Sequence, residues 1–188
     1  VHYFAAAITL YGTEVKGGYE YEGKAYDAKF DHVEGYDSCV GCHNPHTTEV
    51  KVDECAACHE GVASKEDLKK IRMISSAPDY DGDGDAAEGM FDEMNGARDV
   101  LFSAIQSYAT DVAGTGIIYD PATYPYFLAD KDGDSKADVN DTGAAVGYNT
   151  WTPRLLKAAY NYQVSIKDPG AYAHGNKYII QLMYDSTA

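Results

Sequence analysis

The chain has 188 residues, of which 15 are Lys or Arg and 30 are Asp or Glu, so its formal net charge at pH 7 is −15. This length suits one domain that buries its own core, so small size does not demand a metal or disulfide staple. The negative charge repels phosphate groups and excludes nucleic acid and anionic membrane as expected partners. No run of about 18 apolar residues occurs, so no membrane span is predicted.

Residues 1–30 predict one helix and one hairpin. Apolar and aromatic residues recur at helical spacing at Phe4, Ala7, Ile8 and Tyr11. Gly12 then suits a helix C-cap. Residues 17–30 are rich in Tyr, and the pair Glu22-Gly23 is typical of a turn, so we expect a short hairpin there. Because the chain starts at Val1 without a leader pattern, we expect either a removed export signal or a fragment of a longer chain.

The four cysteines form two pairs, each followed at once by a histidine. The two triplets are Cys39, Cys42 and His43, and Cys55, Cys58 and His59. Both read C-x-x-C-H, the attachment motif of c-type haem. Two thiols one turn apart can each add to a haem vinyl group, and the adjacent imidazole then ligates the iron. The sequence therefore predicts two covalently bound c haems.

Zinc and disulfides are the two alternatives for these cysteines. Twelve residues lie between Cys42 and Cys55, a spacing that also suits a zinc ribbon with four thiolate ligands. Zinc leaves both adjacent histidines unexplained, whereas haem attachment requires them. Two disulfides would leave no cysteine over, but nothing in the sequence favours them. Haem is therefore the preferred interpretation.

The second axial position of each haem needs a further ligand, and four histidines remain to supply two. In the order in which we rank them, they are His46, His174, His32 and His2. His46 is too close along the chain to His43 to reach the opposite face of the same haem. We expect it to complete the second haem, aimed by the stiff link Asn44-Pro45. His174 or His32 is expected to complete the first.

Ser64 is a cap-like residue that predicts a short helix, and the first of two acidic loops follows it. The carboxylates of this loop are Asp79, Asp81, Asp83 and Asp85, with Glu88 close behind. Alternate carboxylates converge on a hard cation where glycine lets a loop turn, as at the start of an EF-hand loop. Position 12 is Met90 instead of Glu. The loop is therefore a candidate calcium site, and a solvated acidic loop is the alternative.

Residues 97–109 carry an apolar stripe that predicts an amphipathic helix, at Leu101, Ala104, Ile105 and Tyr108. The second acidic loop follows, with candidate calcium ligands Asp130, Asp132, Asp134 and Asp138. Its sixth position is Ser135 instead of Gly, so it is also not a full EF-hand. Calcium at either loop would have a structural role, because it would neutralise carboxylates that repel one another.

Thr152 and Pro153 are typical of a helix N-cap and first turn, and they start a predicted helix that runs to about Lys167. Its expected buried face is Leu155, Leu156, Ala159, Tyr160 and Val164. A last helix is marked by Tyr178, Ile179, Leu182 and Met183. The expected fold is mainly α with extensive irregular loops. Residues 1–76 form the predicted haem-binding segment, and residues 77–188 pack on it as an acidic-loop and helical segment within one structural domain.

Two stretches resemble known proteins. Residues 32–47, around the first haem motif, and residues 151–163 with 168–174 are similar to the multihaem c-type cytochromes of extracellular electron transfer. The resemblance implies a haem-organised fold, closely stacked haems, two histidines on each iron, and attachment of the haem outside the cytoplasmic membrane. Such proteins usually have more than two haems per chain, so the chain is either a reduced member or the C-terminal part of a longer cytochrome.

The resulting expectation is an electron carrier in the periplasm or outside the cell, with redox proteins or extracellular acceptors as partners. The competing class is a multihaem reductase with one open haem face, which the spare histidines and the acidic field disfavour. Four spare histidines are two more than two haems need. His2 and one other histidine are therefore expected to ligate haems of neighbouring subunits, which would give a homo-oligomer that extends as an open filament.

Overall fold

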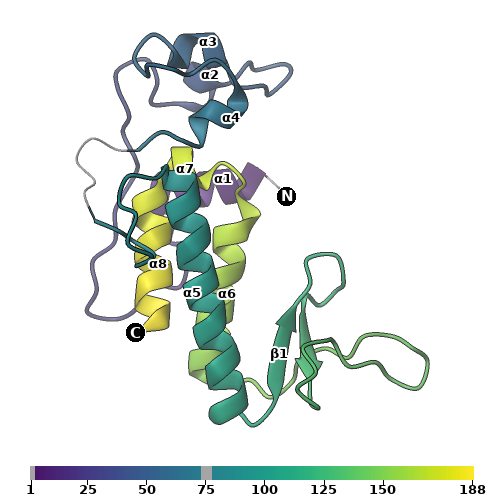
Figure 1. Cartoon of the computed structure of the whole chain (residues 1–188). Helices are drawn as coiled ribbons and strands as arrows, with labels where there is room; N and C mark the ends of the chain where they lie inside the picture. Colours follow the sequence, from purple (N-terminus) through teal and green to yellow (C-terminus); the bar gives the residue numbers. More distant parts are fainter. Residues whose placement is uncertain (1–2, 73–77) are drawn as a thin grey trace.

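The structure is a computed structural model that describes residues 3–72 and 78–188 (Figure 1). Its elements in chain order are α1 Tyr3–Tyr11, the 3₁₀ turn η1 Gly12–Glu14, α2 Cys39–Cys42, α3 Val52–Cys55, α4 Lys65–Leu68, α5 Met90–Asp111, β1 Gly116–Tyr119, β2 Phe127–Asp130, α6 Pro153–Lys167, α7 Ala171–His174 and α8 Asn176–Thr187. Helices dominate and long irregular stretches connect them, which confirms the mainly α prediction. No helix of the described residues is long and apolar enough to cross a membrane.

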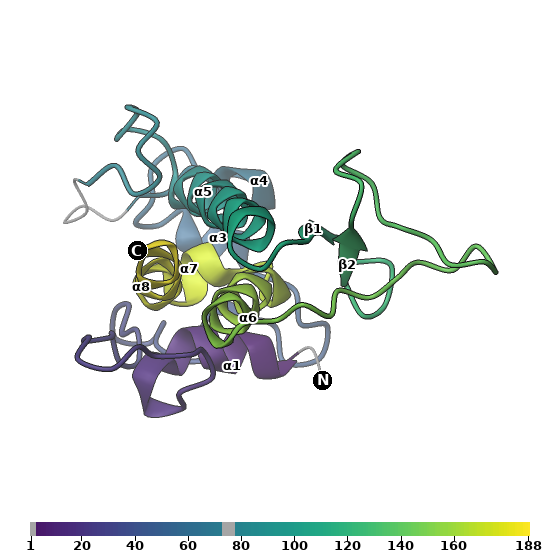
Figure 2. The ribbon, with the colours of Figure 1, turned by 90° about the horizontal axis from the view of Figure 1, so that it is seen from below.

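The core lies where α5, α6 and α8 pack side by side, with α1 against α6 (Figure 2). The helix predicted at 97–109 is part of the longer α5. Its buried stripe starts about two turns before residue 97 and comprises Met90, Met94, Ala97, Leu101, Ile105 and Ala109. All four residues that marked the last predicted helix are buried in α8. Each large apolar side chain removed from water in this way contributes about 1.5–3 kcal/mol before conformational entropy is subtracted.

Helix α6 begins as predicted, but its buried face is different. The Leu155 N–H donates to Thr152 Oγ1 (3.2 Å), and Pro153 occupies the first turn. Leu156 and Tyr160 are about half exposed, at 53% and 49%. The buried positions are Leu155, Ala158, Ala159, Asn161 and Ser165. The face is rotated because Asn161 is buried by pairing: its amide accepts from Tyr19 N–H (2.7 Å) and donates to Tyr19 O (2.9 Å).

The hairpin predicted within residues 17–30 is wrong, since these residues form irregular chain in the structure. Some of their backbone N–H groups donate to side chains of the helices instead of to a partner strand. Gly18 N–H donates to the Tyr178 hydroxyl (3.2 Å), and Asp27 N–H donates to Gln181 Oε1 (2.8 Å). The hairpin that does form is antiparallel β1 and β2, with Gly116 opposite Asp130. It extends sideways at the far end of α5 from the cysteine motifs (Figure 1).

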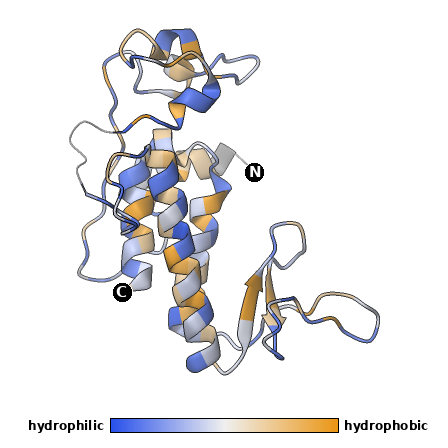
Figure 3. Ribbon diagram, viewed as in Figure 1, coloured by the Kyte–Doolittle hydropathy of each residue, from blue (hydrophilic) through white to orange (hydrophobic). Residues whose placement is uncertain are grey.

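Residues 31–72, which we call the haem-motif segment, form a separate lobe at one end of the helices (Figure 1). All 42 of these residues are described, and Val62 alone among them is buried. Hydrophobic residues, coloured orange in Figure 3, are concentrated along the helices and are scattered in this lobe. The seam to the helices is polar: Met90 N–H donates to Ile71 O (3.0 Å), and Arg72 pairs with the buried Glu93 of α5.

Candidate haem sites

Both cysteine motifs fold into one helical turn that ends at the histidine. In the first, α2 spans Cys39 to Cys42, and His43 N–H donates to Cys39 O (2.8 Å). In the second, α3 ends at Cys55, and His59 N–H donates to Cys55 O (3.0 Å). In each motif, the hydrogen bond from the histidine N–H to the carbonyl of the first cysteine closes one helical turn. The two cysteines therefore lie one turn apart, and the histidine follows directly after the second.

The first motif is held by a tight loop that also orients the imidazole of His43. His43 forms an antiparallel bridge with Val50, and Lys51 N–H donates to Cys42 O (2.9 Å). The ring nitrogen Nδ1 of His43 lies 2.8 Å from Thr48 O. Because a carbonyl only accepts, Nδ1 carries the proton and Nε2 keeps its lone pair. His43 is therefore held in the tautomer that suits iron ligation through Nε2.

A second histidine faces each motif histidine. The ring centroids of His43 and His174 are 6.0 Å apart, and those of His32 and His59 are 5.9 Å apart. A metal–imidazole bond is about 2 Å long, so two imidazoles on opposite sides of one iron have nitrogens about 4 Å apart and ring centroids about 6 Å apart. The centroid separations of both pairs are close to this value.

His174 is positioned by a buried carboxylate and by a glycine. Its Nδ1 lies 2.8 Å from Oδ2 of Asp168, which is 3% exposed. Burial acts to raise the pKa of Asp168, but the hydrogen bond and charge of His174, together with hydrogen bonds from the Thr9 side chain and Gly170 N–H, outweigh it and lower that pKa. A Cβ at Gly170 would lie 2.7 Å from Cε1 of His174, so only glycine leaves room for the imidazole at this place. The last residue of α7 is thereby fixed in one orientation.

The structure does not bring His46 to either motif histidine. His46 was expected beside the second haem, but the structure brings His32 to His59 instead. Asn44 Oδ1 accepts from His46 N–H (2.9 Å) and Thr47 N–H (3.1 Å), which folds the link into a turn. His46 is exposed, and among the described residues its ring makes no aromatic contact. His2 lies outside the described residues.

The four thiols do not converge on a common point. All four cysteines are free, with Cys39 and Cys58 exposed and Cys42 and Cys55 partly buried. Burial raises the pKa of the Cys42 and Cys55 thiols. Within the described ranges, the groups of three potential metal ligands whose atoms lie within 4.8 Å of one another consist of carboxylates alone. The geometry thus favours two separate attachment sites over a four-thiolate zinc ribbon.

The two acidic loops share one conformation. Asp79 accepts from Gly82 and Gly84 N–H (2.6 and 2.8 Å), and Asp130 accepts in the same way from Gly133 and Ser135 N–H (2.9 and 3.2 Å). The converging carboxylates are Asp79, Asp81 and Glu93; Asp81, Asp83 and Glu88; and Asp130, Asp132 and Asp134. Asp85 and Asp138 lie outside these groups, and their carboxylates accept from Ala87 N–H and Lys131 N–H respectively. Glu88 joins these groups from the turn before α5, and Glu93 joins them from the first turn of α5.

Similarity searches find relatives among cytochromes. The chain is 24% identical over 98% of its length to the C-type polyheme cytochrome OmcB of Geobacter sulfurreducens, and 25% identical over 98% to OmcC of the same organism. It spans about a quarter of the length of these curated relatives, 26% and 25%. No family model and no solved structure matches the chain. The chain is thus distantly similar, along nearly its whole length, to part of the c-type polyhaem cytochromes.

Proposed function

We propose that the chain is a two-haem c-type cytochrome that carries electrons. The observation that supports this most is the double pairing of histidines, in which each motif histidine faces one histidine from elsewhere in the chain. In the first site, Cys39 and Cys42 tether the haem, and His43 and His174 ligate its iron. In the second, Cys55 and Cys58 tether the haem, and His59 and His32 ligate the iron. The names of the distant relatives agree with this chemistry.

Filled axial positions favour an electron carrier over a reductase. An iron with two protein ligands offers no coordination position to a substrate, whereas it can gain and lose an electron with little rearrangement. The protein's part is then to hold the ligands, to exclude competing ligands and to tune the potential. Because c-type haem is attached outside the cytoplasmic membrane, the proposal includes export to the periplasm or the cell exterior.

Carbon monoxide binding tests the ligand sets. Reduced wild-type protein should retain two covalent haems per chain and bind no carbon monoxide. His174→Ala and His32→Ala should each open one haem to carbon monoxide, while His46→Ala, a matched exposed histidine, should open none. Carbon monoxide binding by the wild type would support the reductase instead. Binding by His46→Ala but not by His32→Ala would overturn the proposed pairing.

A cytochrome filament is a second candidate function, favoured by the position of the haem-motif segment. This lobe lies at one end of the molecule, and both Cys39 and Cys58 are exposed on it, so a haem there is accessible to another molecule. Since four histidines complete both pairs within one chain, His2 and His46 are not needed as ligands between subunits. Electron microscopy of the purified protein distinguishes regular filaments from discrete particles.

Calcium at the acidic loops stays a prediction. The three carboxylate groups are its basis, because oxygens of this kind at this spacing suit a hard cation. Isothermal titration with calcium chloride should show binding that Asp79→Asn weakens and that Asp85→Asn, whose carboxylate lies outside the groups, leaves unchanged. Equal binding by both variants would exclude the first loop as the site.

A further inference from the structure

The outer ring nitrogens of the two histidine pairs have different partners. In the first pair, Nδ1 of His174 faces the Asp168 carboxylate at 2.8 Å, and Nδ1 of His43 faces the Thr48 carbonyl at 2.8 Å. For His32 and His59, no hydrogen bond to a ring nitrogen occurs among the described residues. One iron would therefore have ligands that are held and polarised, and the other would not.

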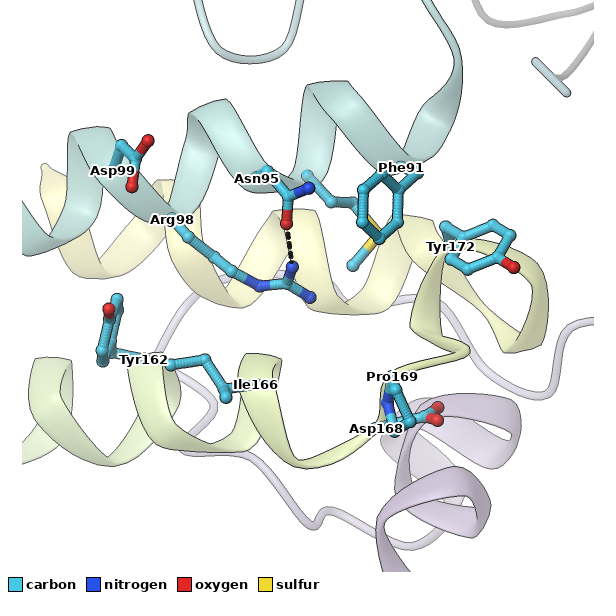
Figure 4. A pocket seen from close by; sticks show the side chains of 10 residues that line it. Phe91, Asn95, Arg98, Asp99, Tyr162, Ile166, Asp168, Pro169 and Tyr172 are labelled. Atoms are coloured by element: carbon cyan, nitrogen blue, oxygen red, sulfur yellow. Dashed lines mark hydrogen bonds between the residues drawn. The ribbon is translucent and has the colours of Figure 1, made fainter. Parts of the chain in front are cut away.

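The negative charge of Asp168 is directed at His174. Oδ2 faces the imidazole, while Oδ1 accepts from Gly170 N–H (3.0 Å). Arg98, the cation on the neighbouring wall of α5, does not pair with it. The Arg98 guanidinium donates to Asn95 Oδ1 on its own helix (2.5 Å, Figure 4) and to Ser165 O on α6 (2.6 Å). Arg98, Asn95 and Asp168 all line a cavity of about 380 Å³. Among the described residues, His174 is the one ion-pair partner of Asp168.

A buried carboxylate that accepts the outer N–H of a ligating imidazole makes that imidazole a stronger donor. A stronger donor, and a negative charge nearby, stabilise ferric iron more than ferrous iron, which lowers the reduction potential. The effect is large here because Asp168 is 3% exposed, so water screens its charge weakly. The Thr48 carbonyl acts in the same direction with a dipole instead of a full charge.

We propose that Asp168, acting through His174, sets the reduction potential of the His43–His174 haem below that of the His32–His59 haem. This inference rests on the proposed function. With both haems bound, transfer of one electron from the His43–His174 iron, which would be oxidised, to the His32–His59 iron, which would be reduced, would be favourable and would need no proton. Asp168 is a positioning residue in this scheme, because it touches the ligand and not the iron.

Asp168→Asn tests the inference, since asparagine can still accept the hydrogen bond but has no charge. Spectroelectrochemical titration should show the lower of two midpoint potentials rising, by about tenfold in the one-electron reduction equilibrium, or about 59 mV. The higher potential should stay unchanged. Asp185→Asn is the matched control: Asp185 is also a largely buried carboxylate that accepts a hydrogen bond, from the Tyr26 hydroxyl (2.8 Å), but it lies at the far end of α8. It should move neither potential.

Different results would contradict the role of Asp168 and the binding of two haems. If Asp168→Asn keeps two low-spin haems but shifts neither potential, or shifts the higher one, the role of Asp168 is overturned while the two-haem proposal stands. If the wild type retains no covalent haem, the proposed function itself fails. A measurement that needs no variant at Asp168 is stepwise reduction followed by nuclear magnetic resonance: the haem whose signals His174→Ala perturbs should be the second to be reduced. If it is the first, the inference is wrong.

Discussion

The haem-motif segment and the helices beside it are built on different principles. Along α5, α6 and α8, buried apolar side chains recur every three or four residues, and Leu101, Ile179 and Leu182 are 0% exposed. Across residues 31–72, Val62 alone is buried, and the helices have four residues each. Helices this short gain little from their own hydrogen bonds. The first region has an apolar core, whereas the second has the two C-x-x-C-H motifs and almost no buried apolar side chain.

The scarcity of buried side chains in residues 31–72 indicates that bound haems would be needed to keep this segment ordered. A segment that buries almost no apolar surface cannot offset the entropy of ordering its backbone, which is about 1–2 kcal/mol per residue. Two thioether links and two axial ligands at each haem would supply the missing restraint, and the porphyrins would supply apolar surface to cover. His174, the last residue of α7, lies beside His43 of the lobe, so one of the two proposed ligand pairs would link both regions.

Under the proposed function, preventing haem attachment should produce the largest difference in stability between the two regions. In a variant with all four cysteines changed to serine, residues 31–72 should lose their protection from amide hydrogen exchange, with an opening free energy near zero. Helices α5, α6 and α8 should stay protected, and most of the helical circular dichroism should remain. Continued protection of residues 31–72 in this variant would show that the lobe folds without haem.

Shortening a side chain in the core should destabilise the helices instead of the haem-motif segment. Leu101→Ala leaves a cavity between α5, α6 and α8, and we expect the free energy of unfolding of the helices to fall by about 2–5 kcal/mol. Val100→Ala is the control, because Val100 is 44% exposed on the other side of the helix, and it should change stability by less than about 0.5 kcal/mol. Urea denaturation followed by circular dichroism measures both. Equal losses would mean that the buried stripe of α5 is misassigned.

Two helix N-caps, each a hydroxyl that accepts a backbone N–H, allow the stability of the two regions to be compared with a smaller expected change in free energy. Thr152 caps α6 in the core, and Ser64 caps α4 in the lobe by accepting from Asp67 N–H (3.3 Å). Thr152→Ala should cost about 1 kcal/mol of global stability, which Thr152→Ser restores. Ser64→Ala in the haem-free protein should leave global unfolding unchanged, because the lobe is already open there. A global loss on Ser64→Ala would contradict independent opening.

The smallest effect is expected at the acidic loop that connects the two regions. Burial, followed by the charges of Asp81 and Asp83, raises the pKa of Glu88 from 4.5 to about 6. The folded state therefore binds this proton more tightly than the unfolded state, so its contribution to stability is full below pH 4.5 and is lost as the pH rises through about 6. Calcium-free Glu88→Gln should match the wild type at pH 4.5 and exceed its stability at pH 7.5. Identical pH profiles would show that Glu88 is not perturbed.

Much of this protein could be predicted from short stretches of sequence. The spacing of the C-x-x-C-H motifs predicts haem attachment, and each motif forms one hydrogen-bonded helical turn. The start of α6 at Thr152 and the apolar face of α8 were also predicted correctly, because caps and helical periodicity depend on residues three or four apart. The hairpin at 17–30 failed because Tyr-rich alternation does not reveal that helix side chains will take the backbone hydrogen bonds.

The tertiary structure alone decided which histidines meet. Sequence proximity favoured His46 for the second site, but the Asn44 turn leaves His46 at the surface, and the path of the chain brings His32 to His59. His174 reaches His43 because α6, α7 and α8 pack against α5 and present the end of α7 to the lobe. Asp168 gave no signal of its own in sequence, since one aspartate among 30 acidic residues is ordinary until packing buries it against an imidazole. The cysteines to which we assign haem attachment are thus specified by local spacing, whereas the proposed distal ligands and the position of Asp168 depend on long-range packing, which no local pattern encodes.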